Sequence, residues 1–192
     1  CIRDRIFYSG EDLMFDKNLL KGKRILVTGG GSGLGKEMSR HFLTYGAEVI
    51  ICGRRDEVLQ KTATELADET KGNISAHSLD IRDSLAIEET INNIFDEGPL
   101  DGLVNNAAGN FISRTNDLSP NGFNAIASIV FHGTFNMTNT VGKKWIELNK
   151  PGTILSITTT WVWTGSPFVV PSAMSKSLSL IHISEPTRPL SI

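Results

Sequence analysis

The chain has 192 residues, a formal net charge of −2 and a sequence pI near 6.1, with 40% hydrophobic and 21% charged residues. These values are typical of one soluble globular domain and give no electrostatic reason to expect nucleic acid as a partner. No apolar run approaches the roughly 18 residues of a membrane span, so we expect no membrane partner. The cysteines Cys1 and Cys52 form neither a metal-binding pattern nor a disulfide framework. We therefore expect no metal, a reducing compartment and a cytoplasmic location, with the organelle undetermined.

Short apolar runs alternate with segments of helical spacing along most of the chain. We predict strands over residues 23–28, 47–52, 74–79, 100–104 and 152–157. The helices between them are predicted to begin near Glu37, at Asp56 as N-cap, at Asp83 or Ser84, and at Ser119-Pro120, the last running towards Leu148. This alternation predicts an α/β fold, a Rossmann-type doubly wound parallel sheet with helices on both faces.

A glycine-rich turn lies between the first predicted strand and the first predicted helix. Glycine allows a tight turn and close approach of the backbone to a pyrophosphate, which rests on the N–H groups of the helix start. Such a turn can be merely structural, but its position favours a dinucleotide site. The residues predicted to contact the cofactor here are Thr28, Gly29, Gly31, Ser32, Gly33, Leu34 and Gly35.

Two arginines, Arg54 and Arg55, follow the second predicted strand. An NAD site places an acid there for the ribose 2′-hydroxyl, whereas arginine suits the 2′-phosphate of NADP(H). We therefore predict NADP(H), the alternative being two solvated arginines at a helix start. Further cofactor contacts are predicted after the third and fourth strands, at Asp80, Ile81, Asn106, Ala107 and Gly109.

The order of these motifs resembles the short-chain dehydrogenase/reductase family. The pattern TGxxxGxG is followed by Asp80, by NNAAG at Asn105–Gly109, by a strand ending in hydroxyls and by Lys176. The resemblance covers about residues 20 to 176. Within the family, the chain is similar to 2,4-dienoyl-CoA reductases in the runs NNAAGNFIS at 105–113, LSP at 118–120, LSITT at 155–159 and FVVPS at 168–172.

This resemblance implies an NADPH-dependent oxidoreductase that reduces an unsaturated 2,4-dienoyl acyl-CoA, with protonation of the dienolate. The residues implied for substrate binding are Arg82, Asn110 and Phe111. An alternative of equal weight is that Arg82 is a solvated loop residue with no role in substrate binding. The resemblance also implies that the full-length parent is a homo-oligomer. Two alternatives stay open: another short-chain reductase acting on a 3-oxoacyl, alcohol or ketone substrate, and a catalytically impaired dinucleotide-binding protein.

The catalytic residues of the family are only partly present. Counting back four from Lys176 gives Ser172 where the family has a tyrosine, and the dienoyl-CoA reductases share that serine. One branch of them supplies a tyrosine at the place of Trp161, whose indole N–H is no general acid.

The resemblance implies that Lys176 lies along the nicotinamide ribose, that Thr159 matches the catalytic serine, and that His132 replaces the asparagine of a proton-relay helix. Together with Ser172 these are the predicted catalytic residues. The alternatives are a surface lysine, a β-branched strand residue and a satisfied core histidine.

The resemblance ends at Lys176–Ser177, and Pro186 and Pro189 forbid a continuous helix beyond. We expect an N-terminal extension over residues 1–19, a partial NAD(P)-binding Rossmann domain over 20–177, and a tail foreign to the domain over 178–192. The chain begins with Cys1, so we expect a processed form or a fragment, truncated at its C-terminal end and lacking the last strands. Activity is therefore expected from the full-length parent rather than from this chain.

Overall fold

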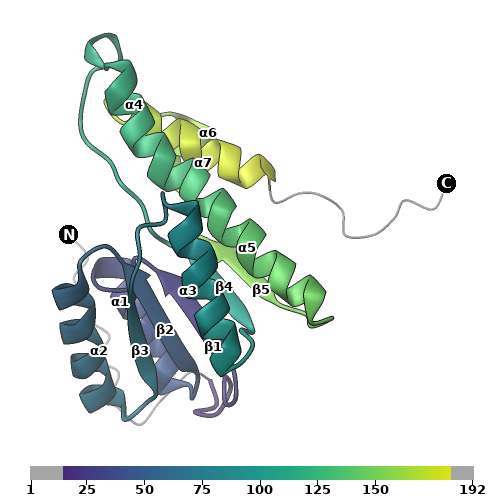
Figure 1. Ribbon diagram of the computed structural model, residues 1–192. Helices are drawn as coiled ribbons and strands as arrows, with labels where there is room; N and C mark the ends of the chain where they lie inside the picture. The colour runs from purple at the N-terminus through teal and green to yellow at the C-terminus, as the bar shows by residue number, and fades with distance from the viewer. Residues whose placement is uncertain (1–14, 183–192) are drawn as a thin grey trace.

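The computed structural model describes residues 15–182, with side chains described as far as Leu180. Five parallel strands form one sheet in the order β3-β2-β1-β4-β5 (Figure 1). The strands are β1 (Arg24–Thr28), β2 (Glu48–Gly53), β3 (Ile74–Ser78), β4 (Gly102–Asn105) and β5 (Thr153–Ser156). The predicted Rossmann-type sheet is confirmed, with each strand within two residues of its predicted bounds.

Helices cover both faces of the sheet (Figure 1). They are α1 (Gly33–Thr44), α2 (Asp56–Thr70), α3 (Ser84–Glu97), the 3₁₀ turn η1 (Thr115–Asp117), α4 (Pro120–Ala127), the π-helical segment η2 (Ser128–Gly133), α5 (Thr134–Glu147), α6 (Trp161–Thr164) and α7 (Val170–His182).

Alternate residues of the strands pack into two separate cores. On β1, Leu26 packs with α3 and α5, whereas Val27 packs with α1 and α2. Leu103 and Val104 of β4 divide in the same way. Both faces of a parallel sheet are buried, so its strands are continuous apolar runs rather than alternating ones.

The helix caps explain two of the predicted starts and correct a third. Asp83 accepts hydrogen bonds from the backbone N–H groups of Leu85 and Ala86, at 3.0 and 3.1 Å. Ser119 caps α4 through Gly122 N at 3.1 Å. The predicted cap at Asp56 is wrong, because Arg55 holds the N-cap position. A carboxylate one residue inside the helix still interacts favourably with the positive end of its dipole.

The predicted long helix towards Leu148 is helical throughout but contains the π-helical segment η2 in its middle. Gly133 ends this segment and is buried. A Cβ there would lie 2.7 Å from two carbon atoms of the Ile81 side chain. Glycine therefore lets the helix approach the loop after β3, and π-helical turns inside α-helices occur frequently at functional sites.

One side of the β4–β5 part of the sheet is incompletely covered. An apolar groove of about 550 Å³ lies there, lined among others by Leu20, Ile25, Phe42 and Leu155. Leu155 is 48% exposed. Within residues 15–182, no strand pairs with the outer edge of β5.

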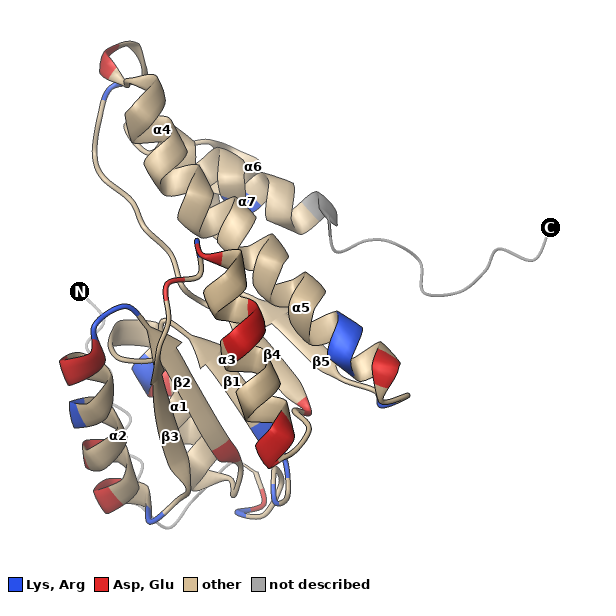
Figure 2. Cartoon of the chain, in the orientation of Figure 1, with Lys and Arg blue, Asp and Glu red and all other residues tan. Residues whose placement is uncertain are grey.

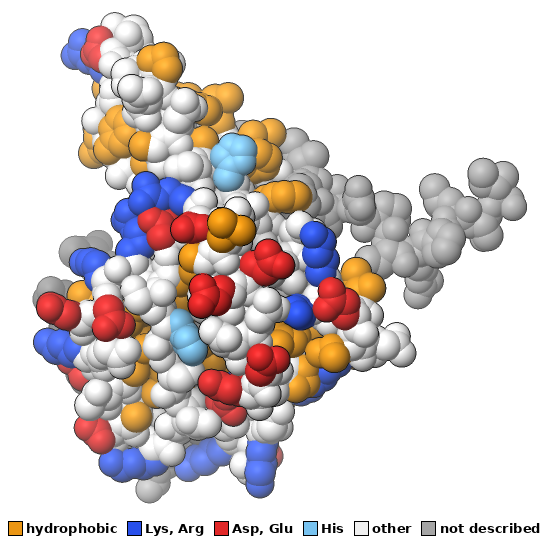
Figure 3. Space-filling model, viewed as in Figure 1, with side chains coloured by type: hydrophobic (Ala, Val, Ile, Leu, Met, Phe, Trp, Pro, Cys, Tyr) orange, Lys and Arg blue, Asp and Glu red, His pale blue; other side chains and the backbone are white. Residues whose placement is uncertain are grey.

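The part of the molecule that contains α4, α6 and α7 differs in surface character from the rest. Figure 2 shows few charged residues on α4, α6 and α7, and Figure 3 shows hydrophobic side chains gathered over the same part. The exposed apolar residues there include Phe111, Ile112, Trp163, Phe168, Met174 and Leu178. Within the described range, every helix is too short or too polar to traverse a bilayer.

Helix α7 runs to His182, past the boundary predicted at residue 177, and Ser179 is buried in it. The foreign origin predicted for residues 178–192 stays a prediction, and Pro186 and Pro189 lie outside the described residues, as does most of the predicted N-terminal extension.

Candidate active site

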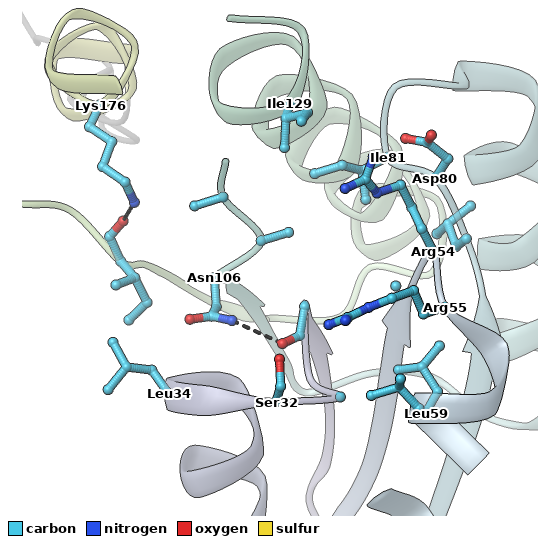
Figure 4. A pocket seen from close by; sticks show the side chains of 18 of the residues that line it. Ser32, Leu34, Arg54, Arg55, Leu59, Asp80, Ile81, Asn106, Ile129 and Lys176 are labelled. Atoms are coloured by element: carbon cyan, nitrogen blue, oxygen red, sulfur yellow. Dashed lines mark hydrogen bonds between the residues drawn. The ribbon is translucent and has the colours of Figure 1, made fainter. Parts of the chain in front are cut away.

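A groove of about 470 Å³ runs along the carboxyl ends of β1, β2 and β4 (Figure 4). In an open parallel sheet this edge is where ligands bind, near the point where the strand order reverses. Here the reversal lies between β1 and β4. The groove brings together the following predicted cofactor residues: Gly29, Gly31, Ser32, Leu34, Arg54, Arg55, Asp80, Ile81, Asn106, Ala107 and Lys176.

The glycine-rich turn is shaped by close backbone approaches. Gly29 has φ +67°, which favours glycine. A Cβ on Gly35 would lie 2.3 Å from the carbonyl oxygen of Gly29. Gly35 therefore lets α1 begin directly against the turn, and the groove floor is backbone rather than side chain. Gly33 also has a positive φ, of +54°, and meets no atom within 4 Å where its Cβ would be.

Thr28 lies under the groove rather than in its lining. Its hydroxyl donates to Val104 O at 3.2 Å and accepts from the backbone N–H groups of Asn106 and Ala107, both at 3.0 Å. The Asn106 amide in turn donates to Thr28 O at 3.0 Å and to Gly29 O at 3.3 Å. These bonds fasten the end of β1 to the loop after β4, which sets the shape of the groove. The predicted contact of Thr28 with the cofactor stays a prediction.

Two arginines and one acid lie at the far end of the groove. Arg54 and Arg55 are exposed and point into it (Figure 4). Asp80 is the only acidic residue of its lining within the described chain. Its carboxylate accepts from the Arg82 guanidinium at 3.0 Å, and this hydrogen bond, together with the nearby charge of Arg54, lowers the pKa of Asp80. The groove is therefore net positive at this end.

Lys176 of α7 reaches the opposite end of the groove. Its ammonium donates to Ile157 O, just after β5 (Figure 4). Burial lowers the pKa of Lys176 below its ordinary value. The alternative of a surface lysine is wrong, because the side chain is half-buried and one of its three N–H donors is engaged.

The residues of the groove fit a dinucleotide. Glycines keep its floor free of side chains, the start of α1 presents backbone N–H groups, and Arg55 forms no ion pair with any described residue. The groove is open to solvent and holds side chains of both charges.

Comparison with known proteins supports this reading. The family model for short chain dehydrogenases matches residues 23–178. The chain belongs to this family.

A Caenorhabditis elegans protein with the name probable 2,4-dienoyl-CoA reductase 3 is 45% identical to this chain over 161 residues. The matched residues cover 82% of this chain and 52% of that protein. The corresponding protein of Bacillus subtilis is 35% identical over 159 residues, covering 82% and 62%.

Among solved structures, a short chain dehydrogenase from Bacillus anthracis superposes with a TM-score of 0.80 at 39% identity, covering 83% of this chain and 66% of that one. The family uses nicotinamide dinucleotides as cofactors. The chain spans about half the length of the C. elegans relative.

The short-chain dehydrogenase resemblance places His132 on the relay helix, but its side chain points away from Lys176. His132 is exposed and contacts Phe131 edge to face, with ring centroids 5.2 Å apart. Its neighbours Val130 and Thr134 line a small cavity that Lys176 also lines. Residues two apart on a helix lie on roughly opposite sides, so His132 faces outward. The alternative of a core histidine is wrong.

The groove lining includes Thr158 but not Thr159, so the predicted catalytic role of Thr159 stays a prediction. Thr158 lines the groove together with Lys176. Ser172 is 5% exposed and also lies outside the lining. Of the predicted catalytic residues, only Lys176 reaches the groove.

The three residues predicted for substrate binding lie elsewhere. Arg82 is exposed, as the alternative of a solvated loop arginine expects, and it pairs with Asp80. Asn110 is exposed, and Phe111 packs towards Gly122 of α4, where a Cβ would lie 3.0 Å from the ring. Gly109 likewise lies outside the groove lining, close to the side chain of Ile129.

Several lining residues were missed by the sequence analysis. They are Gly53, Val58, Leu59, Leu79, Ala108, Ile129, Ile157 and Thr158. Four of them, Gly53, Leu79, Ala108 and Thr158, directly precede or follow a predicted site residue, so the strand ends were the available signal for these. Ile129 gave no such signal, because it reaches the groove from η2, far along the chain.

Proposed function

We propose that the protein is an NADPH-dependent reductase of 2,4-dienoyl acyl-CoA, with this chain forming its cofactor-binding part. The observation that carries the cofactor proposal is the pair Arg54 and Arg55 pointing into the groove from the end of β2. The substrate proposal rests on the relatives, which are named 2,4-dienoyl-CoA reductases at 35–45% identity.

The arginines favour a 2′-phosphate on chemical grounds. A guanidinium donates two parallel hydrogen bonds to phosphate oxygens, and such charge-assisted bonds are about twice as strong as neutral ones. The ribose of NADH offers only neutral hydroxyls at that place, for which an acid would be the expected partner. Asp80, the acid of the groove, is already engaged by Arg82.

The chain's own groups account for binding and orientation at the other end. NADPH would supply a hydride when bound. The Lys176 ammonium, held by Ile157 O, places a positive charge beside the groove, and this charge stabilises an anion forming there. We propose the Thr158 hydroxyl as a donor to the carbonyl or enolate oxygen, in place of Thr159.

The proposed reaction also requires a donor that protonates the dienolate. His132, Thr159 and Ser172 stay candidates, and none lines the groove of the described chain. This observation favours a second candidate function, a dinucleotide-binding protein without turnover. The oligomeric state of the parent and its location in the cell also stay predictions.

Two measurements test the proposal. The chain is titrated with NADPH and with NADH by nucleotide fluorescence, and we expect the NADPH dissociation constant to be at least tenfold lower. The full-length parent is then assayed for NADPH oxidation with a 2,4-dienoyl-CoA. Equal affinity for the two nucleotides contradicts the NADP assignment. Turnover of a ketone or 3-oxoacyl substrate without dienoyl-CoA turnover favours another short-chain reductase, and no turnover favours the binding protein.

A further inference from the structure

A second, much smaller cavity lies behind Lys176, on the side of the sheet covered by α5 and α7. It measures about 10 Å³, which is close to the space that one water molecule requires. Strands β4 and β5 contribute Asn105 and Ser156, and the helices contribute Thr134, Lys176 and Ser179. Lys176 and Thr158 line both this cavity and the groove.

Two oxygen atoms in its lining lack hydrogen bonds. The side-chain Oδ1 of Asn105 and the Oγ of Ser156 are buried, and neither has a partner among the described residues. Leaving such a group unsatisfied costs about 1–3 kcal/mol, so buried orphan atoms call for a partner.

The strand register places these two atoms on the same face. Asn105 and Ser156 are direct partners in the parallel pairing of β4 with β5. The Asn105 amide nitrogen is already used, since it donates to Thr138 Oγ1 at 2.9 Å. Only the acceptor end of the amide is free to meet a ligand.

Two other hydroxyls of the cavity are engaged. Thr134 Oγ1 donates to Val130 O at 2.8 Å, and Ser179 Oγ donates to Ser175 O at 3.0 Å. Lys176 has three N–H donors, of which one reaches Ile157 O. The buried atoms of this lining that lack a partner are therefore one amide oxygen and one hydroxyl, and the remaining ammonium donors of Lys176 lie beside them.

We propose that Asn105 and Ser156 are positioning residues for Lys176, and that they hold one water molecule in this cavity which accepts a hydrogen bond from the Lys176 ammonium. The water donates to Asn105 Oδ1 and bonds to Ser156 Oγ, which gives it the three hydrogen bonds typical of buried water. The ammonium is then held from two sides, by Ile157 O and by the water, with a third N–H left for the groove.

This water stabilises the charged form of Lys176 against the burial that lowers its pKa. The charged groups of the adjoining groove are Arg54, Arg55 and Asp80, and none of them forms an ion pair with Lys176. Lys176 is the only charged residue of the small cavity within the described chain. The role of this positioning in reduction rests on the proposed function, but the water site itself does not.

The test measures the pKa of Lys176 by NMR of the isotope-labelled lysine side chain, without nucleotide or substrate. Ser156→Ala removes one partner of the water, and we expect the pKa of Lys176 to fall by about one unit, the equivalent of one hydrogen bond to a charged group. Thr134→Val is the matched control, because it removes a cavity hydroxyl that already bonds to Val130 O. We expect no change there. An unchanged pKa in Ser156→Ala, or an equal fall in both variants, overturns the proposal.

A crystal structure of the unaltered chain provides an independent measurement. We expect density for one water within hydrogen-bonding distance of Asn105 Oδ1, Ser156 Oγ and Lys176 Nζ. A direct hydrogen bond from Ser156 to Asn105 with no water between them would refute the site, even if the variants failed to fold. Neither measurement depends on NADPH or acyl-CoA, so failure here is distinct from failure of the proposed function.

Discussion

Replacing Gly35 with alanine tests whether backbone contact shapes the groove. The added Cβ would lie 2.3 Å from Gly29 O and 2.7 Å from the Asn106 amide nitrogen. Ordinary contacts of this kind exceed 3.4 Å, so Gly29 or the start of α1 must move by about 1 Å. Overpacking of a well-packed site costs about 1–3 kcal/mol, and more when backbone must shift.

Alanine also favours helix by about 1 kcal/mol relative to glycine, which offsets part of this cost. We expect a net loss of about 2 kcal/mol in the free energy of unfolding, or a Tm lower by about 4–8 °C for a chain of this size. Thermal unfolding followed by circular dichroism measures the change. NADPH affinity should fall as well, because Gly29 lines the groove.

Gly142→Ala is the matched control. Gly142 lies inside α5, and no atom lies within 4 Å of the position of its Cβ. Only the helix propensity applies there, so the Tm should rise by about 2 °C. A Gly35→Ala variant as stable as the unaltered chain would show that the close approach of α1 to the glycine turn does not exist in solution.

Three further predictions concern the groove. Arg55→Ala should weaken NADPH binding about tenfold or more and leave NADH binding unchanged. The control Lys61→Ala, on the exposed side of α2, should change neither affinity. A loss of both affinities in Arg55→Ala would contradict the contact with the phosphate. Burial lowers the pKa of Lys176 in the folded chain below its ordinary value of 10.5. At a pH between the folded-state pKa and 10.5, the lysine is therefore protonated in the unfolded chain but mostly neutral in the folded one. The free energy of unfolding of the unaltered chain, relative to that of Lys176→Met, should therefore rise as pH increases towards 10.5. Denaturant unfolding at neutral and alkaline pH measures this difference. A difference that does not change with pH would show that the lysine is exposed. In the full-length parent, Thr158→Val should lower kcat about 100-fold and Thr159→Val by much less; the reverse order would restore Thr159 as the donor.

The strands, the helix starts and the glycine turn were predictable because their signals are local. The apolar runs of β1, β2 and β4 and the caps at Asp83 and Ser119 depend on residues a few positions apart. The carboxyl ends of parallel strands meet at one edge, so residues after β1, β2, β3 and β4 were expected to converge, and most of them line the groove.

The direction of individual side chains was decided by the tertiary structure. The π-helical segment and the packing of Gly133 against Ile81 turn His132 outward and bring Val130 and Thr134 towards Lys176. No pattern of the sequence marks that rotation, because it depends on a contact between residues about fifty positions apart.

The sequence by itself therefore determined the family, the sheet and the place of the cofactor groove. Only the fold decided that Arg82 engages Asp80, that Thr158 rather than Thr159 lines the groove, and that Asn105 pairs with Ser156. The physical reason is the separation along the sequence of the residues that interact. Secondary structure and turns depend on neighbouring residues, whereas the side-chain orientations in a site depend on packing between elements that are distant in the sequence.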